Sequence, residues 1–307
     1  MRVLFAGTPA VALPALEELR AAGFSVVGVL TRPDAPVGRK RISTPSPVAA
    51  RAAELGLPVI KAARVDEAAQ AAIAALRPDV AAIVAYGAIV PPSALVLPEH
   101  GWINLHFSLL PAWRGAAPVQ HAVINGDDLT GASTFQLEAG LDTGPVFGTV
   151  TEPIRAEDTG SALLDRLSRS GAVLLAQTLA AIADGSAVAI AQSGTVSLAP
   201  KLTIEDGKID FTAPALAISR RIRGVTAEPG AWTWLDGQRF KVGQAVLRPD
   251  QRNLPPGRLA VLGKSLLVGT GSHAIELLAV QPAGKKMMKA ADWLRGIGTV
   301  EGMVFGG

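Results

Sequence analysis

The sequence of 307 residues contains no cysteine, few aromatic side chains and no long apolar run. The absence of cysteine excludes disulfides, thiolate metal ligands and a cysteine nucleophile. The mean hydropathy is +0.32, but no apolar run approaches the roughly 20 residues that a transmembrane helix needs. The first residues lack the basic and apolar regions of a signal peptide. We therefore expect a cytoplasmic protein with no membrane partner.

Charged residues are sparse and unevenly distributed along the chain. They make up 18% of the sequence. Residues 1–200 carry a formal net charge of −3, whereas residues 201–307 carry +6. A basic C-terminal region favours an anionic partner such as nucleic acid, although a solvated basic surface would have the same composition. The length itself favours two domains.

Short apolar segments alternate with segments of helical periodicity in the first 110 residues. The helical segments are Pro14–Ala22, Ser46–Leu55 and Glu67–Leu76. The predicted strands are Val3–Ala6, Ser25–Leu30, Asp79–Ala85 and Trp102–His106. This alternation predicts an α/β domain with a Rossmann-like, doubly wound, mostly parallel sheet. We expect no dinucleotide there, because Gly7-Thr8-Pro9 replaces the G-x-G-x-x-G motif.

The second half of the chain changes from helical to β-type patterns. Gly160–Asp184 has the periodicity of one long helix, and the uncharged segment Ala187–Pro200 is typical of an extended linker. Asp236-Gly237 lies between alternating residues and predicts a hairpin. Further strands are predicted at Leu259–Leu262, Ser265–Gly269 and Ala274–Val280. We predict a catalytic domain at 1–189, a linker at 190–205 and an OB-like β-barrel at 206–307, a fold that often binds nucleic acid.

The residues most suited to chemistry follow the last predicted parallel strand. Asn104 and His106 are two positions apart, so both side chains point to one face. An amide donor beside an imidazole suits attack on a carbonyl. Asp142, bracketed by Gly140 and Gly144, is predicted to lie in a tight loop and to favour the charged form of His106. Taken separately, each group could equally be a packing or turn residue.

Two motifs together resemble the 10-formyltetrahydrofolate-dependent formyltransferases. They are Asn104-x-His106-x-Ser108-Leu109-Leu110-Pro111 and Gly140-Leu141-Asp142-Thr143-Gly144. Further segments resemble the methionyl-tRNA formyltransferase branch of that superfamily, and the resemblance spans the whole chain. These segments are Phe5–Pro9, Thr31–Arg39, Pro45–Pro47, Pro229–Thr233, Gln281–Met288 and Trp293–Gly296.

The resemblance implies transfer of a formyl group from 10-formyltetrahydrofolate, a co-substrate, to the amino group of initiator methionyl-tRNA. It implies catalytic roles for Asn104, His106 and Asp142. The chemistry of these residues agrees, because Asn104 and protonated His106 would stabilise the oxyanion. His106 or a water held by Asp142 would move the proton to the departing folate nitrogen. The residues implied to bind folate are Tyr86, Gly87, Ser108, Leu109, Leu110 and Pro111. Those implied to bind tRNA are Arg39, Lys40, Arg41, Lys285 and Lys286. We expect a monomer that needs no metal.

The long basic loop after the second strand is open to two interpretations. It carries Arg32 and residues 39–41 among prolines and glycines, and is expected to lack regular structure. It could be a solvated surface loop or a loop that grips RNA. Three rival functions also remain at this point: a formyltransferase acting on a nucleotide sugar or glycinamide ribonucleotide, a non-catalytic RNA-binding protein, and a nicotinamide oxidoreductase.

Overall fold

The computed structural model describes residues 1–38 and 41–306. Contacts within the chain divide it into two compact units. The first unit comprises Met1–Pro118, Leu129–Pro153 and Leu164–Ala199, and the second comprises Val119–Asp128, Ile154–Leu163 and Pro200–Gly307. Two short segments that precede Pro200 thus group with the second unit, which no sequence pattern indicated.

The first unit is built on a seven-stranded sheet with strand order β10-β9-β7-β6-β1-β2-β5. Its strands are β1 (Arg2–Gly7), β2 (Ser25–Thr31), β5 (Val59–Lys61), β6 (Val80–Val84), β7 (Trp102–His106), β9 (Leu129–Gln136) and β10 (Val146–Pro153). The five strands from β7 to β5 are parallel, whereas β9 and β10 pair antiparallel. Every residue of β6 is buried, as expected when helices cover both faces. The predicted Rossmann-like sheet is confirmed.

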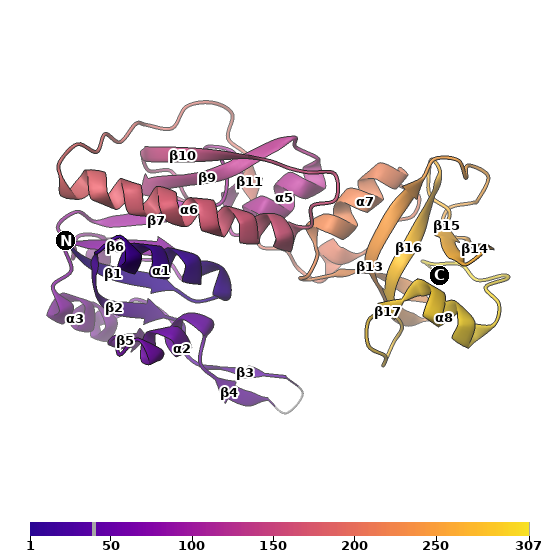
Figure 1. Cartoon of the computed structure of the whole chain (residues 1–307), viewed down its shortest axis with the longest axis horizontal. Helices are drawn as coiled ribbons and strands as arrows, with labels where there is room; N and C mark the ends of the chain where they lie inside the picture. Colours follow the sequence, from indigo (N-terminus) through magenta and orange to yellow (C-terminus); the bar gives the residue numbers. More distant parts are fainter. Residues whose placement is uncertain (39–40, 307) are drawn as a thin grey trace. The chain divides into compact units, whose positions relative to one another are not determined.

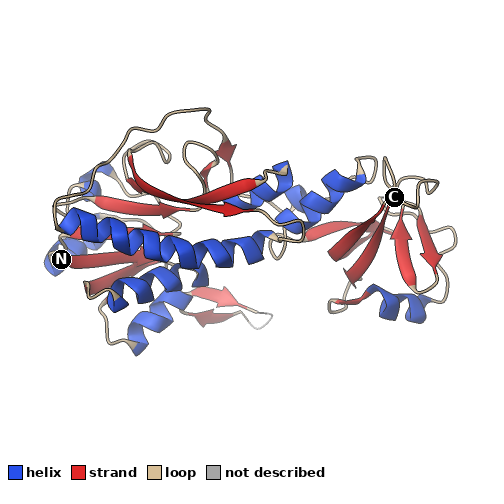
Figure 2. Cartoon of the chain, turned by 45° about the horizontal axis from the view of Figure 1, so that its top comes forward, coloured by secondary structure: helices blue, strands red, loops and turns tan. Residues whose placement is uncertain are grey.

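Helices flank this sheet (Figures 1 and 2). They are η1 (Ala10–Ala12), α1 (Leu13–Ala21), α2 (Pro47–Glu54), α3 (Glu67–Leu76), α4 (Pro92–Leu95) and α6 (Gly160–Ala183). Helix α5 (Pro118–Asn125) groups with the second unit from Val119 onward. Ile73 of α3 packs in one cluster with Leu4 and Trp102. On the other face, Gly171 of α6 lies against Leu105. Strand β7 is therefore covered on both sides. Within the described ranges, no helix is both long and apolar enough to cross a membrane.

The basic loop after β2 contains more structure than expected. Strands β3 (Ala35–Val37) and β4 (Ile42–Thr44) form a two-stranded hairpin. The expectation of an irregular loop was wrong because a proline is tolerated in a ribbon that has no further neighbour. Arg32 donates a hydrogen bond to the carbonyl of Ala63 and so fixes the base of the hairpin. Arg39 and Lys40 lie outside the described residues.

The segment expected to be a linker is extended, but part of it pairs with the first unit. Ile190 forms an isolated antiparallel bridge with Val146 of β10. Strand β11 (Leu198–Ala199) pairs in parallel with β8 (Arg114–Gly115). The uncharged sequence gave no sign of these pairings, because they are made by backbone groups. Residues 190–199 are therefore an integral part of the first unit.

The second unit contains a six-stranded antiparallel sheet with two packed helices (Figure 2). Its elements are η2 (Glu205–Gly207), α7 (Ala215–Gly224), β12 (Ala231–Leu235), β13 (Gln238–Arg248), β14 (Leu259–Leu262), β15 (Ser265–Val268), β16 (Ala274–Gln281), β17 (Met288–Lys289) and α8 (Ala290–Ile297). The predicted hairpin turn is confirmed, and both its residues, Asp236 and Gly237, have positive φ as a type I′ turn requires. The ring of Phe240 packs on Trp293 and Phe305 in the core.

Candidate active site

Strand β7 carries two of the predicted site residues on one face. Asn104 lies opposite Phe135, and His106 lies opposite Ser133 of β9. The Asn104 side chain is half-buried, and within residues 1–38 and 41–306 no hydrogen-bond partner engages its amide. The unused donor and acceptor of Asn104 are thus available to a bound molecule.

Each nitrogen of the His106 imidazole faces an oxygen atom. Its Nε2 lies 2.9 Å from the carbonyl oxygen of Trp113, and its Nδ1 lies 3.7 Å from Oδ2 of Asp142. A carbonyl can only accept a hydrogen bond, so Nε2 carries the proton. In the neutral ring, Nδ1 is then an unprotonated base directed at the carboxylate.

Burial determines the charge of His106. The side chain is 6% exposed, and desolvation lowers its pKa below the ordinary value of 6.5. The carboxylate of Asp142 and the Trp113 carbonyl raise the pKa, but these effects are smaller. A separation of 3.7 Å is also too long for a hydrogen bond to Asp142. The direction of this shift favours the neutral imidazole over the protonated form that the sequence led us to expect.

Asp142 lies in the tight loop that its bracketing glycines predicted. It is 8% exposed and has a φ of +50°, a conformation that aspartate tolerates better than most residues. Its Oδ2 accepts a 2.7 Å hydrogen bond from the backbone N–H of Gly115. A Cβ at Gly144 would overlap the carbonyl oxygen of Gln136, so that position requires glycine. The loop is thereby fixed against β9.

Sequence reasoning missed four groups that define this geometry. They are the Trp113 carbonyl, the Gly115 amide, and the side chains of Gln192 and Ser197. The first two act through backbone atoms, which no residue type reveals. Gln192 donates hydrogen bonds to the carbonyl oxygens of Asp142 and Gly144, and Ser197 accepts one from the N–H of Trp113. Both residues come from the segment expected to be a linker.

Comparison with known proteins identifies the family. A family described as "Formyl transferase" matches residues 1–179, and the family described as "Formyl transferase, C-terminal domain" matches residues 201–298. The chain belongs to the formyl transferase family. A protein of Renibacterium salmoninarum named "Methionyl-tRNA formyltransferase" is 79% identical over 306 residues, which cover 100% of both chains.

Two solved structures share the fold of this formyl transferase. Methionyl-tRNA formyltransferase from Clostridium thermocellum matches with a TM-score of 0.59 and 17% identity over 81% of this chain and 94% of that one. HypX from Aquifex aeolicus, in complex with tetrahydrofolic acid, matches with a TM-score of 0.64 and 16% identity. That match covers 96% of this chain and 47% of HypX, so this formyl transferase spans about half of the larger protein.

The segment Ser108–Pro111 of the formyl transferase is held by hydrogen bonds to Ala112 and to Ser133 of β9. The buried Ser108 hydroxyl donates to the carbonyl of Ala112 at 2.5 Å. Ser133 Oγ donates to the carbonyl of Ser108 and accepts from the N–H of Leu110. Leu109 lies against Gly131, where no side chain could fit. The Ser108 hydroxyl already has an acceptor within the protein.

Tyr86 and Gly87 differ from each other in exposure. The Tyr86 ring is buried in the core cluster that contains Trp102, and its hydroxyl donates to the carbonyl of Ala62 at 2.9 Å. Burial raises the pKa of the Tyr86 hydroxyl. Gly87 is exposed and has a φ of +87°. Of Tyr86 and Gly87, only Gly87 presents its atoms at the surface.

The candidate tRNA-binding residues that the structure describes are all exposed. Arg41 follows the tip of the β3–β4 hairpin in the first unit. Lys285 and Lys286 lie in the turn between β16 and β17 of the second unit. Exposed cations at a hairpin and at a turn can reach a large anionic partner without rearrangement of a core.

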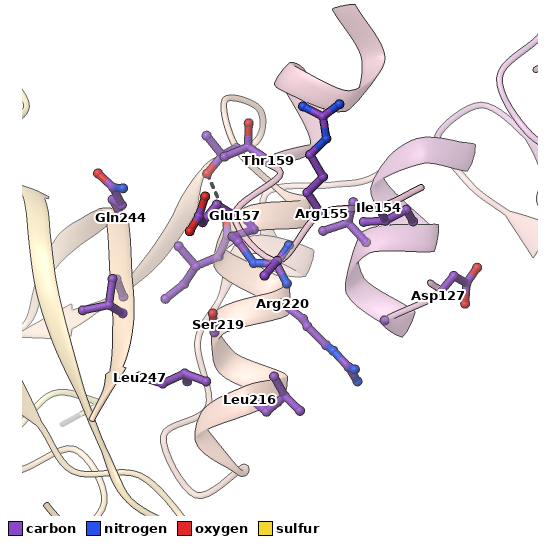
Figure 3. A pocket seen from close by; sticks show the side chains of 18 of the residues that line it. Asp127, Ile154, Arg155, Glu157, Thr159, Leu216, Ser219, Arg220, Gln244 and Leu247 are labelled. Carbon is purple, nitrogen blue, oxygen red and sulfur yellow. Dashed lines mark hydrogen bonds between the residues drawn. The ribbon is translucent and has the colours of Figure 1, made fainter. Parts of the chain in front are cut away.

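A cavity of about 720 Å³ lies entirely within the second unit, between α7 and β13 (Figure 3). Arg155, Glu157 and Arg220 contribute charged side chains of both signs, and Leu216 and Leu247 contribute apolar ones. None of the predicted site residues lines it. Among the described residues, no group of three or more His, Asp or Glu side chains is arranged to hold a metal ion.

Proposed function

We propose that this protein transfers the formyl group of 10-formyltetrahydrofolate to the amino group of initiator methionyl-tRNA. The relative that is 79% identical over its full length carries that name, and HypX, which shares the fold, binds tetrahydrofolic acid. The structural observation that carries the proposal is the buried pair of His106 and Asp142, placed on the same side of β7 as the unpaired amide of Asn104. We place the protein in the cytoplasm and expect it to act as a monomer.

Asn104 would stabilise the charge that develops in the reaction. Attack of the methionyl nitrogen on the formyl carbon forms a C–N bond and leaves a negative oxygen on a tetrahedral centre. An amide donor aimed at that oxygen stabilises the transition state, and the loss of one such donor typically costs roughly 10²–10³-fold in rate. Among the described residues no group bonds the Asn104 amide, which supports this role because no internal hydrogen bond has to break first.

His106 would move the proton that the attack releases. Its neutral Nδ1 can take a proton from the attacking nitrogen, and the same proton then goes to N10 of the folate as the formyl C–N10 bond breaks. Asp142, 3.7 Å away, stabilises the imidazolium that exists between these two steps. A lowered pKa suits this role, because it keeps the base free at neutral pH.

The exposed basic residues would hold the tRNA. Residues 201–307 carry a net charge of +6, and Lys285 and Lys286 are solvated within them. Such contacts to phosphates provide affinity that weakens with salt and carry no sequence information. We assign Arg41, together with Arg39 and Lys40, to the acceptor end of the tRNA because these residues belong to the unit that holds the proposed catalytic groups. The segments Ser108–Pro111 and Tyr86–Gly87 remain our candidates for the folate site.

The test is a formylation assay with several amines. The purified protein is incubated with 10-formyltetrahydrofolate and methionyl-tRNA, and the amino acid is released and analysed for the formyl group. Valyl-tRNA, glycinamide ribonucleotide and a nucleotide-linked amino sugar are tested in parallel. We expect formylation of methionyl-tRNA alone at low enzyme concentration. Preferential formylation of either small amine would overturn the proposal.

A further inference from the structure

We infer that residues 190–199, here called the strap, are a positioning element of the active site, with Gln192 and Ser197 as its two positioning residues. The inference rests on the proposed function, since it assigns these residues to the geometry of His106 and Asp142. Neither side chain touches the reacting atoms. Gln192 fixes the loop that carries Asp142, and Ser197 fixes the Trp113 peptide that bonds His106.

Gln192 holds the Asp142 side. Its Nε2 donates to the carbonyl oxygen of Asp142 at 2.7 Å and to that of Gly144 at 2.9 Å. Its Oε1 accepts two hydrogen bonds from the guanidinium of Arg114, at 3.1 Å from Nε and 2.6 Å from Nη2. One amide therefore joins both ends of the Asp142 loop to the segment that follows Trp113. Bonds to a charged donor are also stronger than neutral ones.

Ser197 holds the His106 side. Its Oγ accepts a 2.8 Å hydrogen bond from the N–H of Trp113, and its backbone oxygen accepts one at 2.9 Å from Arg114. Trp113 has a φ of +58°, an uncommon conformation for a large side chain. The carbonyl of this same residue accepts the hydrogen bond from Nε2 of His106. Ser197 thus fixes the peptide that sets the tautomer and orientation of the imidazole.

A third contact links the strap directly to the Asp142 carboxylate. Gly115, whose N–H donates to Oδ2 of Asp142, has a φ of +128°. A Cβ at Gly115 would lie 2.6 Å from the carbonyl oxygen of Ala199. Only glycine lets the strap approach this closely, and the approach positions the amide that holds the carboxylate.

The strap is held by hydrogen bonds rather than by a buried core. Ile190 and Leu198 are 68% and 61% exposed, and Val196 is also exposed. A segment with few buried apolar contacts contributes little to global stability. Loss of its polar contacts should therefore alter the site without unfolding the unit, which separates a positioning role from a purely structural one.

The experiment compares Gln192→Leu, Ser197→Ala and the control Ser193→Ala in the full-length protein. Ser193 is exposed in the strap and makes no hydrogen bond among the described residues. We expect Gln192→Leu to lower kcat by roughly 10-fold or more, as small misplacements of catalytic groups do, and Ser197→Ala to lower it by less. The KM for methionyl-tRNA and the melting temperature should change little, and the control should match the parent protein.

The pH profile adds a readout that a folding defect would not produce. Asp142 raises the pKa of His106, so a displaced carboxylate lowers that pKa, and the acid limb of kcat should move to lower pH in Gln192→Leu. Gln192→Glu keeps the acceptor for Arg114 but loses both donors to the Asp142 loop, and should behave like Gln192→Leu. An unchanged kcat and acid limb in both Gln192 variants would overturn the inference, as would a loss of activity that follows the melting temperature.

A substrate-free measurement separates this inference from the proposed function. Amide hydrogen exchange of Trp113 and Gly115 reports opening of the site without any turnover. Faster exchange at both amides in Gln192→Leu and Ser197→Ala, but not in Ser193→Ala, supports the strap whatever the amine substrate is. Exchange identical to the parent protein in both variants would refute it. An inactive parent protein would refute only the function.

Discussion

His106 and Asp142 in the first unit are buried and have defined partners, whereas Lys285 and Lys286 in the second unit are exposed. Proton transfer needs groups at fixed short distances, and a buried site strengthens the electrostatic interactions between them. Contact with a phosphate backbone needs only cations that stay solvated until the RNA arrives. The two units should therefore respond differently to substitution, the first through kcat and the second through KM and its dependence on salt.

The largest expected effect is the loss of either group on β7. Asn104→Ala or His106→Ala should lower kcat by roughly 10²–10³-fold, because each removes a group that acts on the transition state. The KM for 10-formyltetrahydrofolate should change much less. Steady-state kinetics at saturating methionyl-tRNA measures both values. The control is His100→Ala, since His100 is exposed; near-normal turnover in both β7 variants would remove the proposed site.

Asp142→Asn should have the next largest effect, and it tests the charge of the buried pair. In the proposed mechanism the neutral imidazole is the active form, so activity should fall as the pH drops through the pKa of His106, which burial lowers. Removing the carboxylate removes an effect that raises this pKa. We expect kcat to fall by roughly 10-fold or more and its acid limb to move to lower pH. The exposed Asp128→Asn serves as the control, and a shift to higher pH would contradict the assignment.

A third test compares the stability effects of a glycine-to-alanine substitution in each unit. Gly144→Ala places a methyl group against the Gln136 carbonyl and should lower the free energy of unfolding by about 1–3 kcal/mol, as overpacking does. Gly296, inside α8, has open space around it. Gly296→Ala should be neutral or raise stability by about 0.5–1 kcal/mol, because alanine favours helices. Denaturant unfolding of the two variants measures the difference, and equal stabilities would contradict the crowding at Gly144.

The smallest effect is expected in the second unit. The double variant Lys285→Ala/Lys286→Ala should raise the KM for methionyl-tRNA and leave kcat unchanged. Each lost phosphate contact should reduce the slope of affinity against salt concentration by roughly one. Lys264→Ala, in the exposed turn between β14 and β15, tests whether position matters or only total charge. An unaltered salt slope in the double variant would separate these lysines from the RNA.

The strands of the first unit were predictable where both faces are covered, because continuous apolar runs such as Val80–Val84 leave little ambiguity. Strand β9 was not, since Leu129–Gln136 mixes glycine, threonine and serine and is buried by elements distant in the sequence, among them β10 and α6. The Asp236-Gly237 turn was predicted because its signal is local. Within the site, residue types indicated Asn104, His106 and Asp142, but the pKa of His106 depends on burial that no sequence motif encodes.

The contacts of Gln192 and Ser197 could not be predicted from the sequence, for a different reason. Both residues act on backbone groups 48 to 84 positions away, and a carbonyl or an N–H is the same in every residue. An uncharged segment without periodicity is also typical of a linker. The expected catalytic boundary at residue 189 would therefore separate the strap from the loops that it holds.

The strap also sets the order in which the site can be assembled during synthesis. The ribosome adds roughly 5–20 residues per second, so Ala199 emerges on the order of 3 to 11 s after Asp142. Throughout that interval the nascent chain holds His106 and Asp142 but lacks the segment that fixes the Trp113 and Gly115 peptides. The proposed catalytic pair is translated early, and its geometry becomes complete only when the chain reaches Ala199, the last residue of the first unit.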